Sequence, residues 1–431
     1  KCTNMIEAAA DAGADAVKLQ TIDADANYVV GSDSYKIFKG SELTREETSD
    51  MFDLARAKGL DIIDFGMGNP DSASPSHVVE KLIEAVQDPR THRYSTSRGI
   101  KGLRRALVRY YKRRFDVDLD AEEEVIVTLG SKEGLANLAS AISAPGDNVL
   151  VPNPSYPIHP YGFIIAGANV QHVPSGPGYD LIKEIHHAVE RSASPPRALV
   201  LNFPNNPTAE VVDLAFYREV VELARRHEIF ILSDIAYAEI YFDSEPPPSV
   251  LQVPGACDIS VEFSSLSKTY SMPGWRVGFG AGNKRLISAL ARIKSYLDYG
   301  AFTPVQVAAS AALDGPQTYV NRIRQRYRER RDVLIESFRV AGWEIPSPRA
   351  TMFVWAPIPT QFQNLGSLEF SKLLLQEAQV AVSPGIGFGK TLDDLRVVGL
   401  GNETFPTSIA LSYKTKIEHL IWVEASNESG D

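Results

Sequence analysis

Ala198-Leu-Val-Leu-Asn202 is followed by an amphipathic helical segment, Asp213 to His227, and then by Ile229-Phe-Ile-Leu232. Nearly continuous apolar runs are typical of strands buried on both faces, as in a parallel sheet. Similar runs alternate with helical segments over roughly residues 59–400 and include Val125-Ile-Val-Thr128, Val149-Leu-Val151 and Ile259-Ser-Val-Glu-Phe263. This alternation predicts an α/β fold with a mostly parallel central sheet and helices on both faces.

Polar residues follow these runs at the points where the runs end. There are five such groups: Gly130-Ser131-Lys132, Tyr156, Asn202 to Asn206, Asp234, and Ser265 to Lys268. The carboxyl ends of parallel strands meet at one edge of a sheet, where open α/β sheets bind ligands. One group alone would be an ordinary polar loop. Five groups of such mixed chemistry predict a site at this edge.

The residue types in these groups fit one cofactor, pyridoxal 5′-phosphate. A lysine amine can form a Schiff base, and a carboxylate can pair with a pyridinium nitrogen. Lys268 and Asp234 are the candidates for these two roles. A helix start with glycine and serine, together with an arginine, can hold a phosphate, and the candidates are Gly130, Ser131, Ser265 and Arg276. Taken singly, Lys268 would be a solvated lysine and Asp234 a helix cap.

Several longer motifs carry a family resemblance. They are Gly66-Met-Gly-Asn-Pro-Asp71, Thr128-Leu-Gly-Ser-Lys-Glu133, Asn205-Asn-Pro-Thr208, Ser233-Asp-Ile-Ala-Tyr237, Ser265-Leu-Ser-Lys-Thr269 and Pro273-Gly-Trp-Arg-Val-Gly278. In this order they resemble class I and II aminotransferases of the fold-type I pyridoxal-phosphate superfamily, over roughly residues 59–403. The resemblance implies a large α/β domain that binds the cofactor and a smaller α+β domain.

The resemblance also implies a role for each matching residue around the cofactor ring and phosphate. Lys268 would form the Schiff base, Asp234 would pair with the ring nitrogen, and Tyr156 would stack on the ring. Tyr237 and Asn206 would hydrogen-bond the phenolic oxygen. The residues expected around the phosphate, beside the backbone of Gly130, are Ser131, Lys132, Ser265, Ser267 and Arg276.

Three further positions concern the substrate and the partner subunit. Arg396 matches the arginine that binds the substrate α-carboxylate as a fork, and Gly68 would add a backbone contact to the same group. Asn206 is expected to bind the substrate as well as the cofactor. Tyr94, in Arg93-Tyr-Ser95, matches a tyrosine that reaches a neighbouring subunit's phosphate, which implies a homodimer. No metal site is expected.

The implied reaction is ping-pong transamination between an L-amino acid and a 2-oxo acid, with Asp234, Tyr237 and Lys268 as the catalytic residues and Lys268 as general base. Tyr156-Pro-Ile-His-Pro-Tyr161 and Phe302-Thr-Pro304 are most similar to bacterial glutamate–pyruvate (alanine) aminotransferases, enzymes of amino-acid biosynthesis. The substrates would then be alanine or glutamate with pyruvate or 2-oxoglutarate. An LL-diaminopimelate or other amino-acid aminotransferase is an alternative, and a non-catalytic ligand-binding protein of this fold is another. Ser265-Leu-Ser-Lys268 also reads as the S-x-x-K of acyl transferases, but the chain has neither S-D-N nor K-T-G.

The sequence predicts four regions. Residues 59–95 and 311–403 would form the small domain, with strands near Met352 to Trp355 and Val380 to Val382, and residues 96–310 the large one. Residues 1–58 resemble the start of sialic-acid synthases, with Lys18 and Gln20 at positions that bind phosphoenolpyruvate in those barrel enzymes. One or two strands cannot close a barrel, so we expect no synthase activity. Residues 404–431 form an atypical tail without a strong pattern.

Composition narrows the class of protein further. The chain of 431 residues has 44 Lys and Arg against 54 Asp and Glu, a net charge of −10, which gives no support for nucleic-acid binding. It has two cysteines, Cys2 and Cys257, so a disulfide framework is not expected. No apolar stretch is long enough for a membrane span, and no signal-peptide pattern is seen, so a cytoplasmic enzyme acting on small molecules is expected.

Two local expectations concern helices. Ser74 is expected to cap a helix with Pro75 in its first turn and an apolar stripe of Val78, Val79, Leu82 and Ile83. The basic stretch from Arg322 to Arg331 is expected to be a solvated helix face, interleaved with Ile323, Tyr327 and Leu334.

Overall fold

The computed structural model of the chain describes residues 63–66, 68–378, 380–389 and 408–412. These residues divide into two compact units. The larger unit is built from residues 68–355 and 388–389, and the smaller from 63–66, 356–378, 380–387 and 408–412. Residues 1–58, with Lys18 and Gln20, and Arg396 lie outside the described residues. The domain boundaries expected from the sequence stay a prediction.

The larger unit contains a seven-stranded sheet. Its strand order is β2 (Val125–Thr128), β8 (Gly278–Gly282), β7 (Ser260–Ser265), β6 (Phe230–Asp234), β5 (Ala198–Asn202), β3 (Asn148–Asn153) and β4 (Asn169–Pro174). Strand β8 runs antiparallel to both of its neighbours, whereas the neighbouring pairs from β7 to β4 are parallel. The predicted mostly parallel sheet is therefore confirmed.

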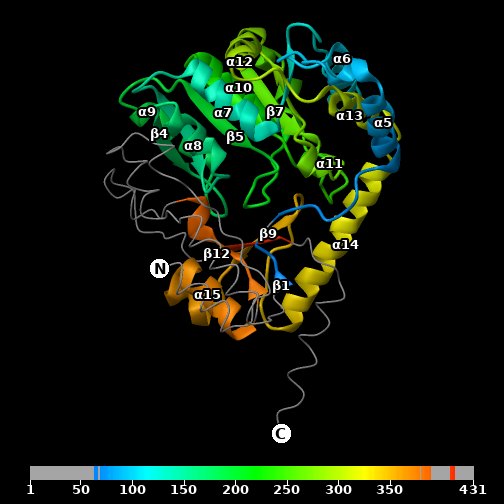
Figure 1. Cartoon of the computed structure of the whole chain (residues 1–431). Coiled ribbons are helices and arrows are strands. Elements are labelled where there is room, and N and C mark those ends of the chain that lie inside the picture. The colour runs from blue at the N-terminus through cyan, green and yellow to red at the C-terminus, as the bar shows by residue number, and fades with distance from the viewer. Residues whose placement is uncertain (1–62, 67, 379, 390–407, 413–431) are drawn as a thin grey trace, which may run out of the picture. The chain divides into compact units, whose positions relative to one another are not determined.

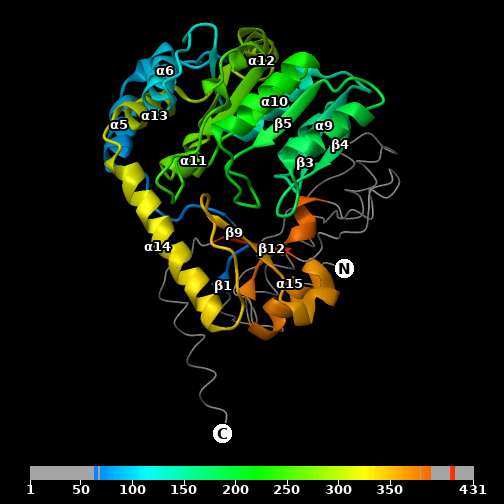
Figure 2. The ribbon, with the colours of Figure 1, turned by 180° about the vertical axis from the view of Figure 1, so that it is seen from behind.

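Helices cover both faces of this sheet (Figure 1; Figure 2). Strand β5 shows the alternation that allows this, because Val200 belongs to one apolar cluster and Leu199 and Leu201 to the other. The Val200 cluster includes α7 (Ser131–Ile142), α8 (Ile158–Ile165) and α12 (Lys284–Leu297). The Leu199 cluster includes α5 (Ser76–Gln87), α6 (Lys101–Phe115), α9 (Leu181–Arg191), α10 (Leu214–Arg226) and α13 (Thr303–Asp314).

Helix α10 begins and ends within one residue of its predicted bounds, and its cap Asp213 accepts a hydrogen bond from the Phe216 N–H at 2.8 Å. The prediction for α5 is partly wrong. Its N-cap position is Pro75, and the Ser74 hydroxyl instead donates to the Ser271 carbonyl at 2.8 Å. Val78 is buried, but Ile83 is 53% exposed, so only part of the predicted apolar stripe faces the core.

Helix α14 (Thr318–Val340) contains the basic stretch. Ile323, Tyr327 and Leu334 are buried as predicted. The expected solvated face is wrong for four of the arginines, since other parts of the larger unit supply acceptors for them. These pairs are Arg330 with the Asp71 carboxylate at 2.7 Å, Arg328 with the Phe242 carbonyl at 2.7 Å, Arg331 with the Pro348 carbonyl at 3.1 Å, and Arg324 with the Glu239 carboxylate at 3.3 Å.

The smaller unit contains short strands and one long helix. Strand β1 (Ile63–Asp64) pairs in parallel with β10 (Val380–Ala381), and α15 (Gly366–Ala378) precedes β10 in the chain. A three-stranded sheet has the order β11 (Ser383–Pro384), β12 (Ser408–Ser412), β9 (Phe353–Pro357), and the last two residues of β9 belong to this unit. Strands β9 and β10 lie where strands were predicted, whereas β12 lies in the tail for which no element was predicted.

The remaining regular elements are short. They are α11 (Leu266–Thr269) and the 3-10 turns η1 (Pro89–His92), η2 (Val250–Gln252), η3 (Ala256–Asp258), η4 (Pro273–Trp275), η5 (Thr360–Leu365) and η6 (Gly385–Phe388). Within the described ranges, every helix is too short or too polar to serve as a membrane span.

Candidate active site

The strand register brings the predicted polar groups to one edge of the seven-stranded sheet. Asn202, the last residue of β5, pairs with Asp234, the last residue of β6, and Asp234 in turn pairs with Phe263 of β7. On the other side of β7, Thr128 and Ser265 both pair with Gly278, so the ends of β2 and β7 flank the start of β8. This edge carries the side chains that could act on a ligand.

An anion cradle is formed where β2 leads into α7. Gly130 precedes Ser131, the first residue of α7, with a φ of 94°, a conformation that glycine adopts readily. A Cβ on Gly278 would approach the Ser131 nitrogen to 2.6 Å, so β8 lies directly against the helix start. The backbone N–H groups at a helix N-terminus attract an anion such as phosphate.

Arg276 supplies a cation to this cradle. Its guanidinium donates to the Leu129 carbonyl at 3.1 Å and to the Pro273 carbonyl at 3.0 Å. It lies so close to Gly130 that a Cβ there would be 2.3 Å from Nη2. Ser265 caps α11 by accepting from the Ser267 N–H at 3.4 Å, and both serines are buried. Arg276, Ser265 and Ser267 are therefore placed where they could bind an anion.

Lys268 lies on α11, three residues after the end of β7. Its Nζ donates to the Gly68 carbonyl at 2.7 Å. Burial, and then the charge of Arg276, lowers the pKa of Lys268 to about 8. A larger fraction of this amine is therefore neutral near pH 7 than for an ordinary lysine, and the neutral amine is the nucleophilic form.

Asp234 is a buried carboxylate with defined partners. Its Oδ1 accepts from the Ala236 N–H at 3.0 Å, and its Oδ2 lies 3.2 Å from Nε2 of His159. The Asn202 side chain donates to the Asp234 carbonyl at 2.8 Å. His159, on α8 and 1% exposed, was not among the residues predicted from the sequence. The only signal for it was its place in Tyr156-Pro-Ile-His-Pro-Tyr161, three residues after a predicted site tyrosine.

Tyr156 and Asn206 also lie among these residues. The Tyr156 ring contacts the His159 ring edge-on, with centroids 5.9 Å apart, and the Lys132 Nζ lies 6.0 Å from the Tyr156 centroid. Burial, and then the charge of Asp234, raises the pKa of Tyr156. The Asn206 N–H donates to Asn202 Oδ1 at 2.8 Å, while its own Oδ1 is buried without a hydrogen-bond partner. A buried polar atom without a hydrogen-bond partner is costly, and a bound ligand can remove this cost. If the side-chain amide turns by half a turn, its NH₂ group takes the place of Oδ1 and can donate to an oxygen of the ligand.

The remaining predicted residues lie in different settings. Tyr237 is buried, with its ring edge-on to Phe353 at 5.5 Å. Tyr94 is 86% exposed and its ring lies 4.7 Å from that of Tyr299. Gly68 contacts Lys268 through its carbonyl, which cannot bind a carboxylate, so the predicted backbone contact would have to come from its N–H. Arg396 lies outside the described residues.

The described residues fit pyridoxal 5′-phosphate on three independent observations. The amine of Lys268 has a lowered pKa, the cradle at Gly130 and Arg276 suits a dianion, and the buried side-chain oxygen of Asn206 lacks a partner. In the described part of the chain, no group of three or more His, Cys, Asp or Glu side chains is placed to hold a metal ion.

Comparisons with known proteins show which family the chain resembles. The chain is 59% identical over 350 residues to the putative aminotransferase AatC of Rhizobium meliloti, covering 81% of this chain and 86% of that protein. It is 56% identical over 342 residues to the glutamate-pyruvate aminotransferase AlaC of Escherichia coli, covering 79% and 83%. An LL-diaminopimelate aminotransferase of Moorella thermoacetica is 42% identical over 335 residues, covering 78% and 85%.

Solved structures give the same result. Substrate-bound BacF of Bacillus subtilis matches with a TM-score of 0.77 at 32% identity, covering 94% of this chain and 96% of that one. A probable N-succinyldiaminopimelate aminotransferase of Thermus thermophilus matches with a TM-score of 0.76 at 30% identity, covering 86% and 95%. The family model for aminotransferase class I and II matches residues 60–403. The protein therefore belongs to the class I and II aminotransferases, a family of pyridoxal-phosphate-dependent transaminases.

Proposed function

We propose that this chain transfers the amino group of alanine or glutamate to pyruvate or 2-oxoglutarate, with its cofactor bound covalently at Lys268. The observation that carries the assignment to Lys268 is the lowered pKa of its amine, at the sheet edge that also presents Asp234 and the anion cradle. The choice of substrates is supported by the 56% identity to the glutamate-pyruvate aminotransferase AlaC.

Different residues of the chain would bind different parts of the cofactor. The cofactor phosphate would accept hydrogen bonds from the backbone at Gly130 and from Ser131, Lys132, Ser265, Ser267 and Arg276. Tyr156 would stack on the ring, and Tyr237 and Asn206 would donate to its phenolic oxygen. Asp234, held by His159 and by the Ala236 N–H, would keep the ring nitrogen protonated. His159 thus fixes the carboxylate orientation that this pairing needs.

Lys268 performs the proton transfer. The bound cofactor supplies an electron sink for the Cα–H bond of the amino acid. Lys268 would hold the cofactor, and its Nζ, as a neutral amine, would remove the Cα proton of the substrate as a general base. Its lowered pKa suits this role near neutral pH. Arg396 would hold the substrate carboxylate, with the Gly68 N–H as a second donor. The first product leaves as a 2-oxo acid before the second 2-oxo acid binds, which gives ping-pong kinetics.

The enzyme would act as a homodimer in the cytoplasm. Large apolar side chains that are exposed support the dimer, because a second subunit would cover them. Five of them, 49% to 86% exposed, are Tyr94, Tyr296, Leu297, Tyr299 and Phe302, and the rings of Tyr94 and Tyr299 lie 4.7 Å apart. Tyr94 would extend to the partner's cofactor phosphate.

An LL-diaminopimelate aminotransferase is the second candidate, favoured by relatives at 42% identity such as the Moorella protein. A panel of donors separates the two. Purified protein with added pyridoxal 5′-phosphate is supplied with alanine, glutamate or LL-diaminopimelate, each with pyruvate and 2-oxoglutarate. We expect kcat/KM for the alanine–2-oxoglutarate pair to exceed that for LL-diaminopimelate. The reverse order would reject the proposed substrates, and no turnover with any donor would reject the function.

A further inference from the structure

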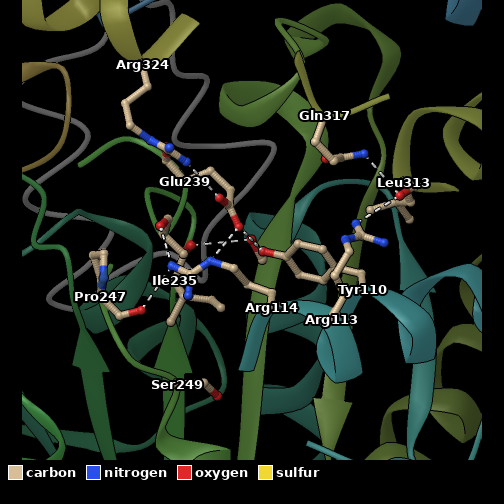
Figure 3. Close-up of polar contacts among 12 residues, drawn as sticks. Tyr110, Arg113, Arg114, Ile235, Glu239, Pro247, Ser249, Leu313, Gln317 and Arg324 are labelled. Carbon is tan, nitrogen blue, oxygen red and sulfur yellow. Dashed lines mark hydrogen bonds and ion pairs between the residues drawn. The ribbon is translucent and has the colours of Figure 1, made fainter. Parts of the chain in front are cut away.

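Glu239 is a buried carboxylate two residues after Tyr237, and the proposed mechanism does not use it. Its side chain is 8% exposed and accepts hydrogen bonds from three side chains (Figure 3). Oε1 accepts from the Tyr110 hydroxyl at 2.8 Å and from Arg114 Nε at 3.1 Å, and Oε2 accepts from Arg324 at 3.3 Å. A buried carboxylate with this many donors is fixed in one position.

The same two arginines also bind the backbone next to Tyr237. Arg114 donates to the Ala238 carbonyl at 3.2 Å, and Arg324 donates through Nε to the Glu239 carbonyl at 3.1 Å. The two peptide carbonyls that follow Tyr237 are thus both held by guanidinium groups. The turn is also closed internally, because the Ile240 N–H donates to the Tyr237 carbonyl at 3.0 Å.

These arginines come from two distant helices. Arg114 lies in the last turn of α6 and Arg324 in the second turn of α14, so Glu239 joins both helices to the turn between Asp234 and Tyr241. The Arg324 guanidinium also lies 3.9 Å from the Tyr241 ring centroid. Tyr110 stays a neutral donor, because burial and the charge of Glu239 raise its pKa. The charged side chains that contact Glu239 are Arg114 and Arg324, and neither guanidinium deprotonates in a protein.

We propose that Glu239, clamped between Arg114 and Arg324, is a positioning residue that fixes the Tyr237 phenol toward the phenolic oxygen of the cofactor. This rests on the proposed role of Tyr237. The alternative is a purely structural ion pair, which would contribute to stability without affecting the cofactor. Only one residue, Ala238, lies between Glu239 and Tyr237. If Arg114 and Arg324 no longer hold Glu239, the position of the Tyr237 phenol changes directly.

The test uses a spectroscopic signature of the bound cofactor without substrate. A donor to the phenolic oxygen stabilises the deprotonated form of the Lys268–cofactor linkage, so losing the donor raises the pH midpoint of its absorbance change. Tyr237→Phe should raise the midpoint by about 1 pH unit or more, the size expected for a hydrogen bond to a charged group. Glu239→Gln keeps the shape and the acceptor for Tyr110 but removes the charge. It should raise the midpoint by at least ~0.3 pH unit.

The two variants are combined to show whether Glu239 acts through Tyr237. In a Tyr237→Phe background, Glu239→Gln should add no further shift. Glu122→Gln is the control, since Glu122 pairs with the buried Arg104 at 3.0 Å and neither contacts a proposed site residue. It should leave the midpoint unchanged. If Glu239→Gln does not fold, Arg324→Lys keeps the charge but loses the fork, and should shift the midpoint in the same direction.

Each outcome decides the proposal. A shift in Glu239→Gln that vanishes in the Tyr237→Phe background supports it. A shift of the same size in both backgrounds overturns it, because Glu239 would then act by another route. A shift in Tyr237→Phe but none in Glu239→Gln overturns the clamp and leaves the role of Tyr237 intact. No shift in either variant overturns the role of Tyr237 and the clamp with it.

Discussion

Replacement of Gly130 by Ala tests the anion cradle. The new Cβ would lie 2.3 Å from Nη2 of Arg276, far inside van der Waals contact, so the guanidinium must move away from the start of α7. At the φ of 94° and ψ of 158° found here, alanine adds backbone strain of about 1–3 kcal/mol. This strain is present with and without cofactor, so it lowers the stability of the fold but cancels from the binding constant. The displacement of Arg276 does not cancel from the binding constant, because Arg276 is a proposed phosphate ligand.

The expected loss follows from the displaced contact. A hydrogen bond from a charged group contributes about 1.5–3 kcal/mol, so the dissociation constant of pyridoxal 5′-phosphate should rise by about 10- to 100-fold. Cofactor-free protein is titrated with pyridoxal 5′-phosphate and followed by absorbance, and thermal unfolding of the same samples is recorded. Gly178→Ala is the matched control, since Gly178 has the same φ of 94° and a Cβ there meets nothing within 4 Å. Both variants should lose stability, and only Gly130→Ala should lose affinity. Equal cofactor affinities in the two variants would refute the cradle.

The other predictions concern Lys268, Arg396 and the first 58 residues. Lys268→Ala should abolish the borohydride-trapped cofactor adduct and lower turnover by at least ~10²-fold, and mapping of the adduct to another lysine would reject the assignment. Because the pKa of Lys268 is about 8 and the neutral amine reacts, the rate of adduct formation in cofactor-free protein should rise with pH and level off above about 8; a rate independent of pH between 6 and 9 would contradict this reasoning. Arg396→Lys should weaken amino-acid affinity while cofactor affinity is kept, and unchanged affinity for both alanine and glutamate would exclude the fork. Ala at both Lys18 and Gln20 should leave transamination within about twofold. Phosphoenolpyruvate-dependent condensation with an N-acylated amino sugar that Lys18→Ala removes would instead reveal a second active site.

The sheet, and the meeting of the polar groups at one edge of it, were predictable from the sequence for one physical reason. Backbone hydrogen bonding in a parallel sheet aligns the strand ends, so residues such as Asn202 and Asp234, 32 positions apart, must become neighbours once their strands pair. Apolar runs mark the strands, and the polar residue after each run therefore marks the edge. The apolar pattern of each strand and the direction of the strands can both be inferred from one sequence.

Helix ends and surface helices were less predictable. Ser74 satisfies every local rule for a cap, yet its hydroxyl donates to Ser271, 197 residues away, because the two segments meet in the folded unit. The basic face of α14 has the composition of a solvated helix. Its arginines are partly buried only because Asp71, Glu239 and Phe242 present acceptors to them from other segments. Strand β12 lies in a segment without a strong sequence pattern, so it becomes recognisable through its pairing with β11 and β9.

The contacts that hold the candidate site residues in place were the least predictable from the sequence. Lys268, Asp234 and Tyr237 were predicted as site residues because each belongs to a motif, but the groups that contact them or their neighbours come from distant positions. His159 reaches Asp234 across 75 residues, the Gly68 carbonyl reaches Lys268 across 200, and Arg324 reaches Glu239 across 85. A histidine or an arginine on a helix has no local feature that separates a solvated side chain from one that binds a buried carboxylate. The difference is made by the element packed against it, and a buried carboxylate is stable only where such a donor exists. Each buried acid near a motif therefore implies a distant basic or polar partner, whose identity has to come from the fold.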